Sequence, residues 1–345
     1  MEQYAGLDVS LESTSVCVVD ASGHVVREAK VPSRPQALIV WFGEHGTAMA
    51  RIGLEAGPLS QWLYAAMKAA GLLVELLETR HVRLAFKAMT IKTDRKDALG
   101  IAHLMRMGWF RPVHCKSVPA QEVRALLTAR KLLLGRRIDI EMSLRGILRG
   151  FGLKVGKTTP KSFDDRIREL TDGHPVLTAI AVAMLAARPV IMKAFKAIES
   201  RLLAQSRRDE RVRTLMSTPG VGALTALTFV AAIDDPDRFE SSRMVGAHFG
   251  LTPRKYQSGE TDVTGRISKV GDHGVRVALY EAANIILTRS AKNSVRKSWA
   301  QGVAKRGGMK KAKVALARNL AVVLHQMLKT GTRFSATGYP AAVAA

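Results

Sequence analysis

The chain has 345 residues, of which 47% are hydrophobic and 24% are charged, a balance typical of folded globular proteins rather than disordered or fibrous ones. Its 53 lysines and arginines exceed its 29 aspartates and glutamates, giving a formal net charge of +24 that favours polyanionic partners, nucleic acid first. Two cysteines without metal-ligand spacing argue against a zinc site or a disulfide framework. The longest apolar run, residues 175–187, is too short to span a bilayer, so we expect no membrane partner.

The first 112 residues alternate strand and helix patterns. Short β-rich runs at 4–9, 14–20 and 24–30 predict an antiparallel meander, with a glycine turn between the last two. The following pattern predicts a helix, a strand, a helix and a strand, at 34–45, 50–56, 59–71 and 72–78. A hairpin followed by βαβ units predicts a mixed sheet with helices on its faces, an α/β architecture that includes the ribonuclease-H-like fold. We assign this domain to residues 1–112.

The middle of the chain, residues 113–210, predicts a helical arm. Apolar residues at three- and four-residue spacing predict one long helix over 116–150, a break at 152–162, and more helix to about 210. Between 81 and 160, 17 basic residues face 5 acidic ones. The arm could therefore lie along a phosphate backbone, with Arg136 and Arg137 as candidate contacts. The alternative is a solvated cationic helix face.

Residues 211–345 predict a mostly helical C-terminal domain. The PGVG sequence at 219–222 joins two helical stretches, and Gly220 and Gly222 could present backbone N–H groups to a phosphate. A tight turn between helices explains the motif about as well. From residue 282 onward there are 12 lysines and arginines and no acidic residue. Lys310, Lys311 and Lys313 are therefore further candidate nucleic-acid contacts.

Four carboxylates stand out within this basic chain. Asp94 and Asp97 share one face of a helical turn and would repel each other. Asp8 lies within the first predicted strand and Glu55 ends a later one, where an unpaired acid is costly. Together the four could bind Mg²⁺ or Mn²⁺, and a pair of such ions can act on a phosphodiester. The alternatives are helix capping behind Thr93 for the aspartate pair, and a strand-edge or turn role for the other two.

Several motifs resemble one known family. GLDVS, GLEAG and KTDRKDA, followed by STPGVG and by FGLTPRKYQSGETDVTGRISKVGDHGVRVALY, are similar to transposases of the insertion-sequence 110 and 1111 families, relatives of the pilin-gene invertases. The resemblance covers nearly the whole chain. It implies an N-terminal domain like the RuvC resolvase, in which the four carboxylates match a DEDD metal site. It also implies a catalytic serine in the C-terminal domain, matched by Ser258; Ser268 is the competing position. Arg254 and Lys255, just before Ser258, are candidate nucleic-acid contacts.

The resemblance implies a DNA transposase that cleaves and rejoins strands through a covalent phosphoserine. It also implies a guide RNA, encoded by the element, that pairs with donor and target DNA. We expect a homo-oligomer, a dimer or a tetramer, in the bacterial cytoplasm and at the nucleoid when bound to DNA. Two other functions stay open: a RuvC-like structure-specific nuclease that uses metal and water, and a non-catalytic DNA-binding protein.

Overall fold

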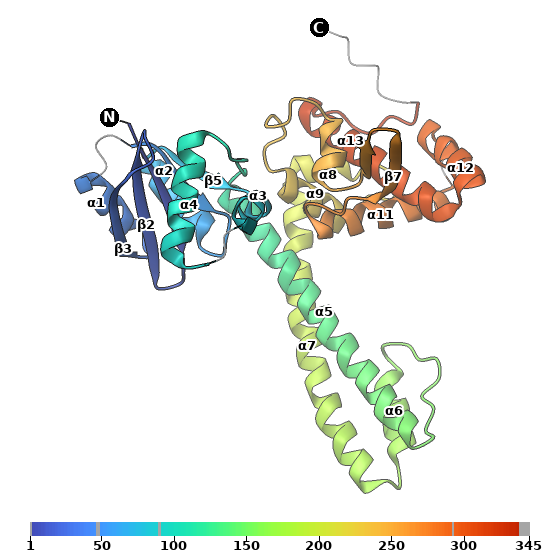
Figure 1. Cartoon of the computed structure of the whole chain (residues 1–345). Coiled ribbons are helices and arrows are strands. Elements are labelled where there is room, and N and C mark those ends of the chain that lie inside the picture. Colours follow the sequence, from blue (N-terminus) through green and yellow to red (C-terminus); the bar gives the residue numbers. More distant parts are fainter. Residues whose placement is uncertain (1, 46–48, 89–90, 292, 338–345) are drawn as a thin grey trace. The chain divides into compact units, whose positions relative to one another are not determined.

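The computed structural model describes residues 2–45, 49–88, 91–291 and 293–337. It divides into two compact units, Met1–Lys116 and Ser117–Ala345, each described below by itself. The second unit contains both the predicted arm and the predicted C-terminal domain (Figure 1). The three-part division at residues 112/113 and 210/211 stays a prediction.

The first unit is built on a five-stranded sheet with the order β3-β2-β1-β4-β5. Its strands are β1 (Gln3–Val9), β2 (Ser13–Asp20), β3 (Val25–Pro32), β4 (Met49–Glu55) and β5 (Val74–Leu77). The first three are antiparallel, whereas β4 pairs in parallel with β1 and β5 in parallel with β4. The predicted α/β mixed sheet with flanking helices is confirmed.

Strand alternation assigns one helical layer to each face of this sheet. Leu7 and Leu54 pack with buried residues of α1 (Pro35–His45) and α2 (Ser60–Ala69). The opposite face holds Gly6 and Gly53, which are register partners on β1 and β4. This face is covered by α4 (Asp94–Met107), and the shorter α3 (Thr79–Ala85) precedes it in the chain. A Cβ on Gly6 would lie 2.1 Å from the carbonyl oxygen of Ala98, so the glycine lets the α4 backbone rest directly on the strand.

The arm of the second unit is a pair of long helices, α5 (Val118–Gly150) and α7 (Pro175–Arg208), with the short α6 (Phe163–Thr171) at its far end (Figure 1). The long helix over 116–150 and the helical arm are thus found as predicted. The helix predicted to continue to about 210 is interrupted at 172–174, where Gly173 has a positive φ of 77°. A small apolar core at the tip joins the three helices and includes Leu148, Phe163 and Leu177.

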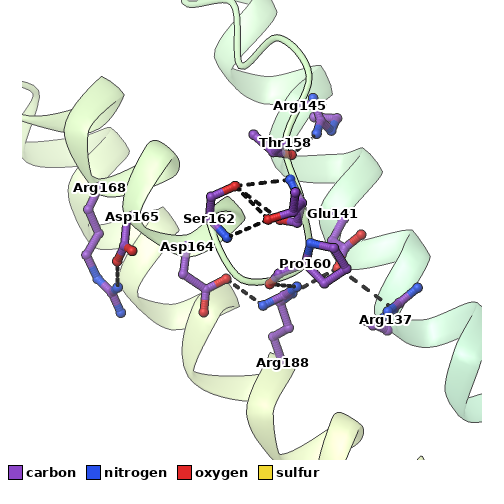
Figure 2. Close-up of polar contacts among 11 residues, drawn as sticks. Arg137, Glu141, Arg145, Thr158, Pro160, Ser162, Asp164, Asp165, Arg168 and Arg188 are labelled. Atoms are coloured by element: carbon purple, nitrogen blue, oxygen red, sulfur yellow. Dashed lines mark hydrogen bonds and ion pairs between the residues drawn. The ribbon is translucent and has the colours of Figure 1, made fainter.

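The interior of the arm also contains a buried arginine. Arg188 is only 4% exposed and donates hydrogen bonds to Glu141 Oε1 at 2.9 Å, Asp164 Oδ1 at 2.7 Å and the carbonyl oxygen of Pro160 at 2.9 Å (Figure 2). A buried charge needs such partners, and here they come from α5, from α6 and from the loop between them. Arg188 of α7 therefore links this helix to α5, to α6 and to the loop between them.

By length and composition alone, α7 could cross a membrane, with a mean hydropathy of 1.9 over an 18-residue window. This corrects the length argument made for residues 175–187, since that run is only part of a 34-residue helix. In the structure α7 instead packs along α5 and carries the buried Arg188.

The rest of the second unit is mostly helical, as predicted. Its helices are α8 (Glu210–Leu215), α9 (Ala223–Ile233), α10 (Met244–His248), α11 (His273–Thr288), α12 (Val295–Gly307) and α13 (Met309–Thr330). They enclose a core in which Phe229, Leu279 and Leu320 are buried, and which Val123 of α5 and Leu202 of α7 join. A hairpin of β6 (Pro253–Ser258) and β7 (Thr261–Ile267) was not predicted.

Candidate active site

The fold of the first unit places Asp8 and Glu55 on one face of the sheet. Each follows by two residues a glycine that packs under α4, Gly6 on β1 and Gly53 on β4. Because side chains alternate along a strand, both acids share the α4-covered face and lie at the carboxyl ends of neighbouring parallel strands. Both also line a cavity of about 630 Å³ that extends over the loops following β1 and β4.

Asp94 and Asp97 occupy the first turn of α4, the helix that covers this face. Thr93 is the N-cap, and its Oγ1 accepts a hydrogen bond from the backbone N–H of Lys96 at 3.2 Å. The capping explanation is therefore correct as local structure, and both acids benefit from the positive end of the helix. Because Thr93 is the capping residue, capping does not exclude a ligand role for the two carboxylates. Asp97 is buried against the sheet, and Asp94 is exposed.

Two of the four carboxylates, Asp8 and Glu55, have pKa values that burial and neighbouring charges shift. Burial raises the pKa of Asp8 to about 6, and the charges of Asp94 and Asp97 raise it as well. Burial, followed by the charge of Asp8, also raises the pKa of Glu55. Lys92 opposes both shifts, and its Nζ lies 3.6 Å from Asp97 Oδ2. The structure thus places Asp8 within electrostatic range of the other three predicted acids, and we call the four acids the carboxylate cluster. Sequence reasoning missed the neighbouring Lys92.

The donor set of this cluster fits a hard divalent cation, because all four side chains offer carboxylate oxygens. Among the described residues, no group of three or more metal-binding side chains is spaced closely enough to hold one ion as the side chains lie. Binding would therefore draw the carboxylates inward from their present positions. Burial first, and then repulsion from Asp94 and Asp97, raises the pKa of Asp8, and a bound cation would offset both effects.

Ser258 lies at the tip of the β6–β7 hairpin in the second unit. It is the last residue of β6, pairs with Thr261 and is exposed; Gly259, which follows, has a φ of +54°. Ser268, the competing position, is half-buried, and its backbone N–H donates to the carbonyl oxygen of Thr252 at 2.8 Å. Of the two serines, Ser258 is therefore the more accessible to a large substrate.

The two basic residues preceding Ser258 both have partners in the hairpin region. Lys255 Nζ lies 3.1 Å from Asp262 Oδ2 on the facing strand. Arg254 Nη2 donates to the carbonyl oxygen of Ser268 at 3.2 Å. Their side chains are exposed, so both could still reach a phosphate, although Lys255 would do so with part of its charge already compensated.

Two further pairs of residues that we predicted to contact nucleic acid, Arg136 with Arg137 and Gly220 with Gly222, have structural surroundings that bear on this role. Arg136 lies 3.3 Å from Asp139 and Arg137 lies 3.8 Å from Glu141. Both arginines of the arm's shaft, meaning the paired helices α5 and α7, therefore have acidic neighbours. A Cβ on Gly220 would approach the carbonyl oxygen of Ala282 to 2.6 Å, which gives this glycine a packing role against α11. Gly222 is the N-cap of α9 and has open space around its Cα.

The lysines of the acid-free segment differ from one another. Lys310 and Lys311 are exposed in the first turn of α13, where the positive helix end disfavours cations. Lys313 is half-buried, with its Nζ 5.9 Å from the centre of the Tyr280 ring. Of these three lysines, Lys310 and Lys311 have no ion pair or ring contact among the described residues. Lys292 and residues 338–345 of this segment lie outside the described residues.

Comparison with known proteins places both parts of the chain in transposase families. A family model for DEDD transposases of IS110 elements, described as "Transposase", matches residues 5–152, and "Transposase IS116/IS110/IS902 family" matches residues 212–300. The transposase of insertion element IS1111A from Coxiella burnetii is 29% identical, covering 94% of this chain and 88% of the relative. A probable family 20 transposase from Pseudomonas aeruginosa is 26% identical, covering 95% and 97%. A solved structure, Thermus thermophilus RuvC with a Holliday junction substrate, is 16% identical with a TM-score of 0.26, covering 33% of this chain and 100% of that one. The chain belongs to the insertion-sequence 110/1111 family of DEDD transposases.

Proposed function

We propose that this transposase cleaves and rejoins DNA by using the carboxylate cluster of its first unit together with Ser258 of its second. The observation that carries the proposal is the convergence of Asp8, Glu55, Asp94 and Asp97 on one face of the sheet. Burial, and after it the charges of neighbouring carboxylates, raises the pKa values of Asp8 and Glu55, and half-buried acids of this kind are costly unless a cation compensates them.

In this proposal the four carboxylates would hold Mg²⁺ or Mn²⁺, which when bound stabilises negative charge on a scissile phosphate. The Ser258 hydroxyl attacks the phosphorus and loses its proton, so that a bond from Ser258 Oγ to phosphorus forms. The bond from phosphorus to the leaving strand oxygen breaks, and that oxygen takes up a proton. Attack by the hydroxyl of another DNA end reverses these steps and joins the new strands.

The accessibility of Ser258 at the hairpin tip supports its role over that of Ser268. The guide RNA that would pair with donor and target DNA, and the assembly into a dimer or tetramer, rest on the family resemblance. The excess of basic residues in the second unit is compatible with both nucleic acids.

The test is to incubate the protein with its element's RNA, donor DNA, target DNA and Mg²⁺, and to run the quenched reaction on a denaturing gel. We expect recombinant junctions and a DNA–protein adduct. Ser258→Ala should lose both the adduct and cleavage, whereas Ser268→Ala, the matched control, should keep the adduct. Cleavage by Ser258→Ala that leaves free ends would show that water attacks, and a metal-dependent nuclease would replace the transposition chemistry proposed here.

A further inference from the structure

The far end of the arm carries a basic loop, residues 151–162, that joins α5 to α6. Its lysines, Lys154, Lys157 and Lys161, are all exposed. The sequence has no acidic residue from 142 to 163, so the loop sits within a purely cationic stretch. In the part of the chain that the structure describes, none of the three lysines belongs to an ion pair.

Arginines of the surrounding helices hold this loop in place. Arg145 donates to the carbonyl oxygen of Gly156 at 2.7 Å. Arg145 also donates to Thr158 Oγ1 at 2.6 Å, and Arg188 donates to the carbonyl oxygen of Pro160 (Figure 2). Both guanidinium groups also lie over the ring of the buried Phe163, each 5.3 Å from its centre. The loop backbone is thus fixed by contacts at several positions, which lowers the entropy cost of binding through its side chains.

The acidic side chains nearest to the loop are paired with arginines. Asp164 accepts a hydrogen bond from Arg188, Asp165 lies 3.5 Å from Arg168, and Glu169 lies 2.8 Å from an arginine one turn before it on α6. Within the loop itself, the charged side chains are the three lysines, and none of them has an acidic partner among the described residues. The two arginines predicted as contacts along the arm, Arg136 and Arg137, by contrast have acidic neighbours.

We propose that the loop 151–162, called the arm tip, docks on the phosphate backbone of duplex DNA, the substrate class of the proposed function. Lysine is a point charge that suits phosphate contacts without base recognition. Proteins that bind single strands stack successive bases on several aromatic side chains, whereas the tip exposes only Phe151, at its first position. A 33-residue helix is about 50 Å long, so the tip would contact DNA far from the helical body of the unit.

The test compares two triple variants of the full-length protein. The tip variant is Lys154→Gln, Lys157→Gln and Lys161→Gln, and the matched control removes three exposed shaft lysines by Lys131→Gln, Lys193→Gln and Lys196→Gln. Binding to a labelled duplex of about 30 base pairs is measured by fluorescence anisotropy over a range of salt concentrations, without divalent metal. Circular dichroism checks that both variants keep their helices.

We expect the log–log salt slope of the tip variant to be less steep than that of the wild type by up to about 2.7, or about 0.9 for each phosphate that the variant no longer neutralises. The shaft control should change the slope by less than half as much. An unchanged slope, or an equal change in both variants, would overturn the assignment of the tip. A weakening seen with duplex RNA of the same sequence but absent with DNA would overturn the choice of partner.

The outcomes also separate this inference from the proposed function. If the wild type binds duplex DNA in a salt-dependent manner and forms the Ser258 adduct while the tip variant binds as the wild type does, only the arm tip is wrong. If the wild type itself shows no salt-dependent DNA binding, the proposed function fails as well.

Discussion

Asp8 illustrates how one residue can be unfavourable for folding and useful for function. Its strand neighbour Leu7 is fully buried in the core beneath α1 and α2, while Asp8 points to the side covered by α4. Desolvation and the carboxylates of Asp94 and Asp97 all favour its protonated form, which raises its pKa to about 6. Near neutral pH the metal-free protein therefore holds a charge that its fold does not stabilise.

We predict that Asp8→Asn stabilises the metal-free protein near pH 7.5 by about 1–2 kcal/mol, and by about half as much near pH 5. Folding raises the pKa of Asp8 above its ordinary value of 3.8, so the stability gained from the protonated form is lost as the pH rises through about 6. Urea unfolding of both proteins in the presence of a chelator measures the difference. Equal stabilisation at the two pH values would show that charge repulsion is not the cause.

At the residue scale, the order and spacing of the four acids could be found in the sequence, because strand alternation and helix periodicity are local rules. The role of Lys92 could not. Its approach to Asp97 depends on the loop before α4, where the sequence has no periodicity to interpret.

At the scale of elements, the active-site face depends on how closely α4 approaches the sheet. Gly6 and Gly53 make this approach possible, since a Cβ on Gly53 would come within 2.8 Å of the Met105 side chain and one on Gly6 would collide with the α4 backbone. The packing places the first turn of α4, with Asp94 and Asp97, beside the strand ends that carry the other two acids. Backbone contact is therefore what positions the cluster.

We predict that Gly6→Ala destabilises the protein by about 3 kcal/mol and abolishes DNA cleavage, because a methyl group 2.1 Å from the Ala98 carbonyl oxygen forces α4 away from the sheet. Gly43→Ala is the matched control. Gly43 is exposed on α1 with nothing within 4 Å of an added Cβ, so alanine should stabilise the helix by about 0.5–1 kcal/mol. Chemical denaturation measures the change in unfolding free energy of both variants. A destabilisation of less than about 1 kcal/mol in Gly6→Ala would contradict the packing argument.

The elements that sequence analysis found and those it missed differ in burial. The meander of β1 to β3 was predictable because apolar residues and a glycine turn mark its strands. The β6–β7 hairpin was missed because every residue of β6 is exposed, so its strands have no apolar alternation to detect. The interruption between α6 and α7 was missed because Asp172 and Gly173 form a short turn within a longer helical pattern.

At the scale of the whole molecule, charge is divided unequally between the two units. Residues 1–116 contain 14 basic and 11 acidic residues, a net charge of +3, whereas residues 117–345 contain 39 and 18, a net charge of +21. Nonspecific attraction to nucleic acid follows net charge and basic surface. The first unit, which holds the carboxylate cluster, should therefore contribute little to that attraction, and the second unit should supply most of it.

We predict that binding and chemistry can be separated by mutations in the two units. Asp97→Asn should abolish cleavage while leaving DNA affinity and its salt dependence unchanged, because it alters a ligand in the nearly neutral unit. Lys310→Gln with Lys311→Gln should weaken binding and reduce the salt slope by up to about 1.8, while cleavage at saturating DNA persists. Lys313→Gln is the control, because the Lys313 ammonium lies near the Tyr280 ring, and it should change the slope by less than either exposed lysine.

Anisotropy titrations measure DNA affinity and its salt dependence, and cleavage assays on the same preparations measure the chemistry. A steep loss of affinity in Asp97→Asn would mean that the carboxylate cluster itself takes part in holding DNA, and the division of labour between the units would be wrong.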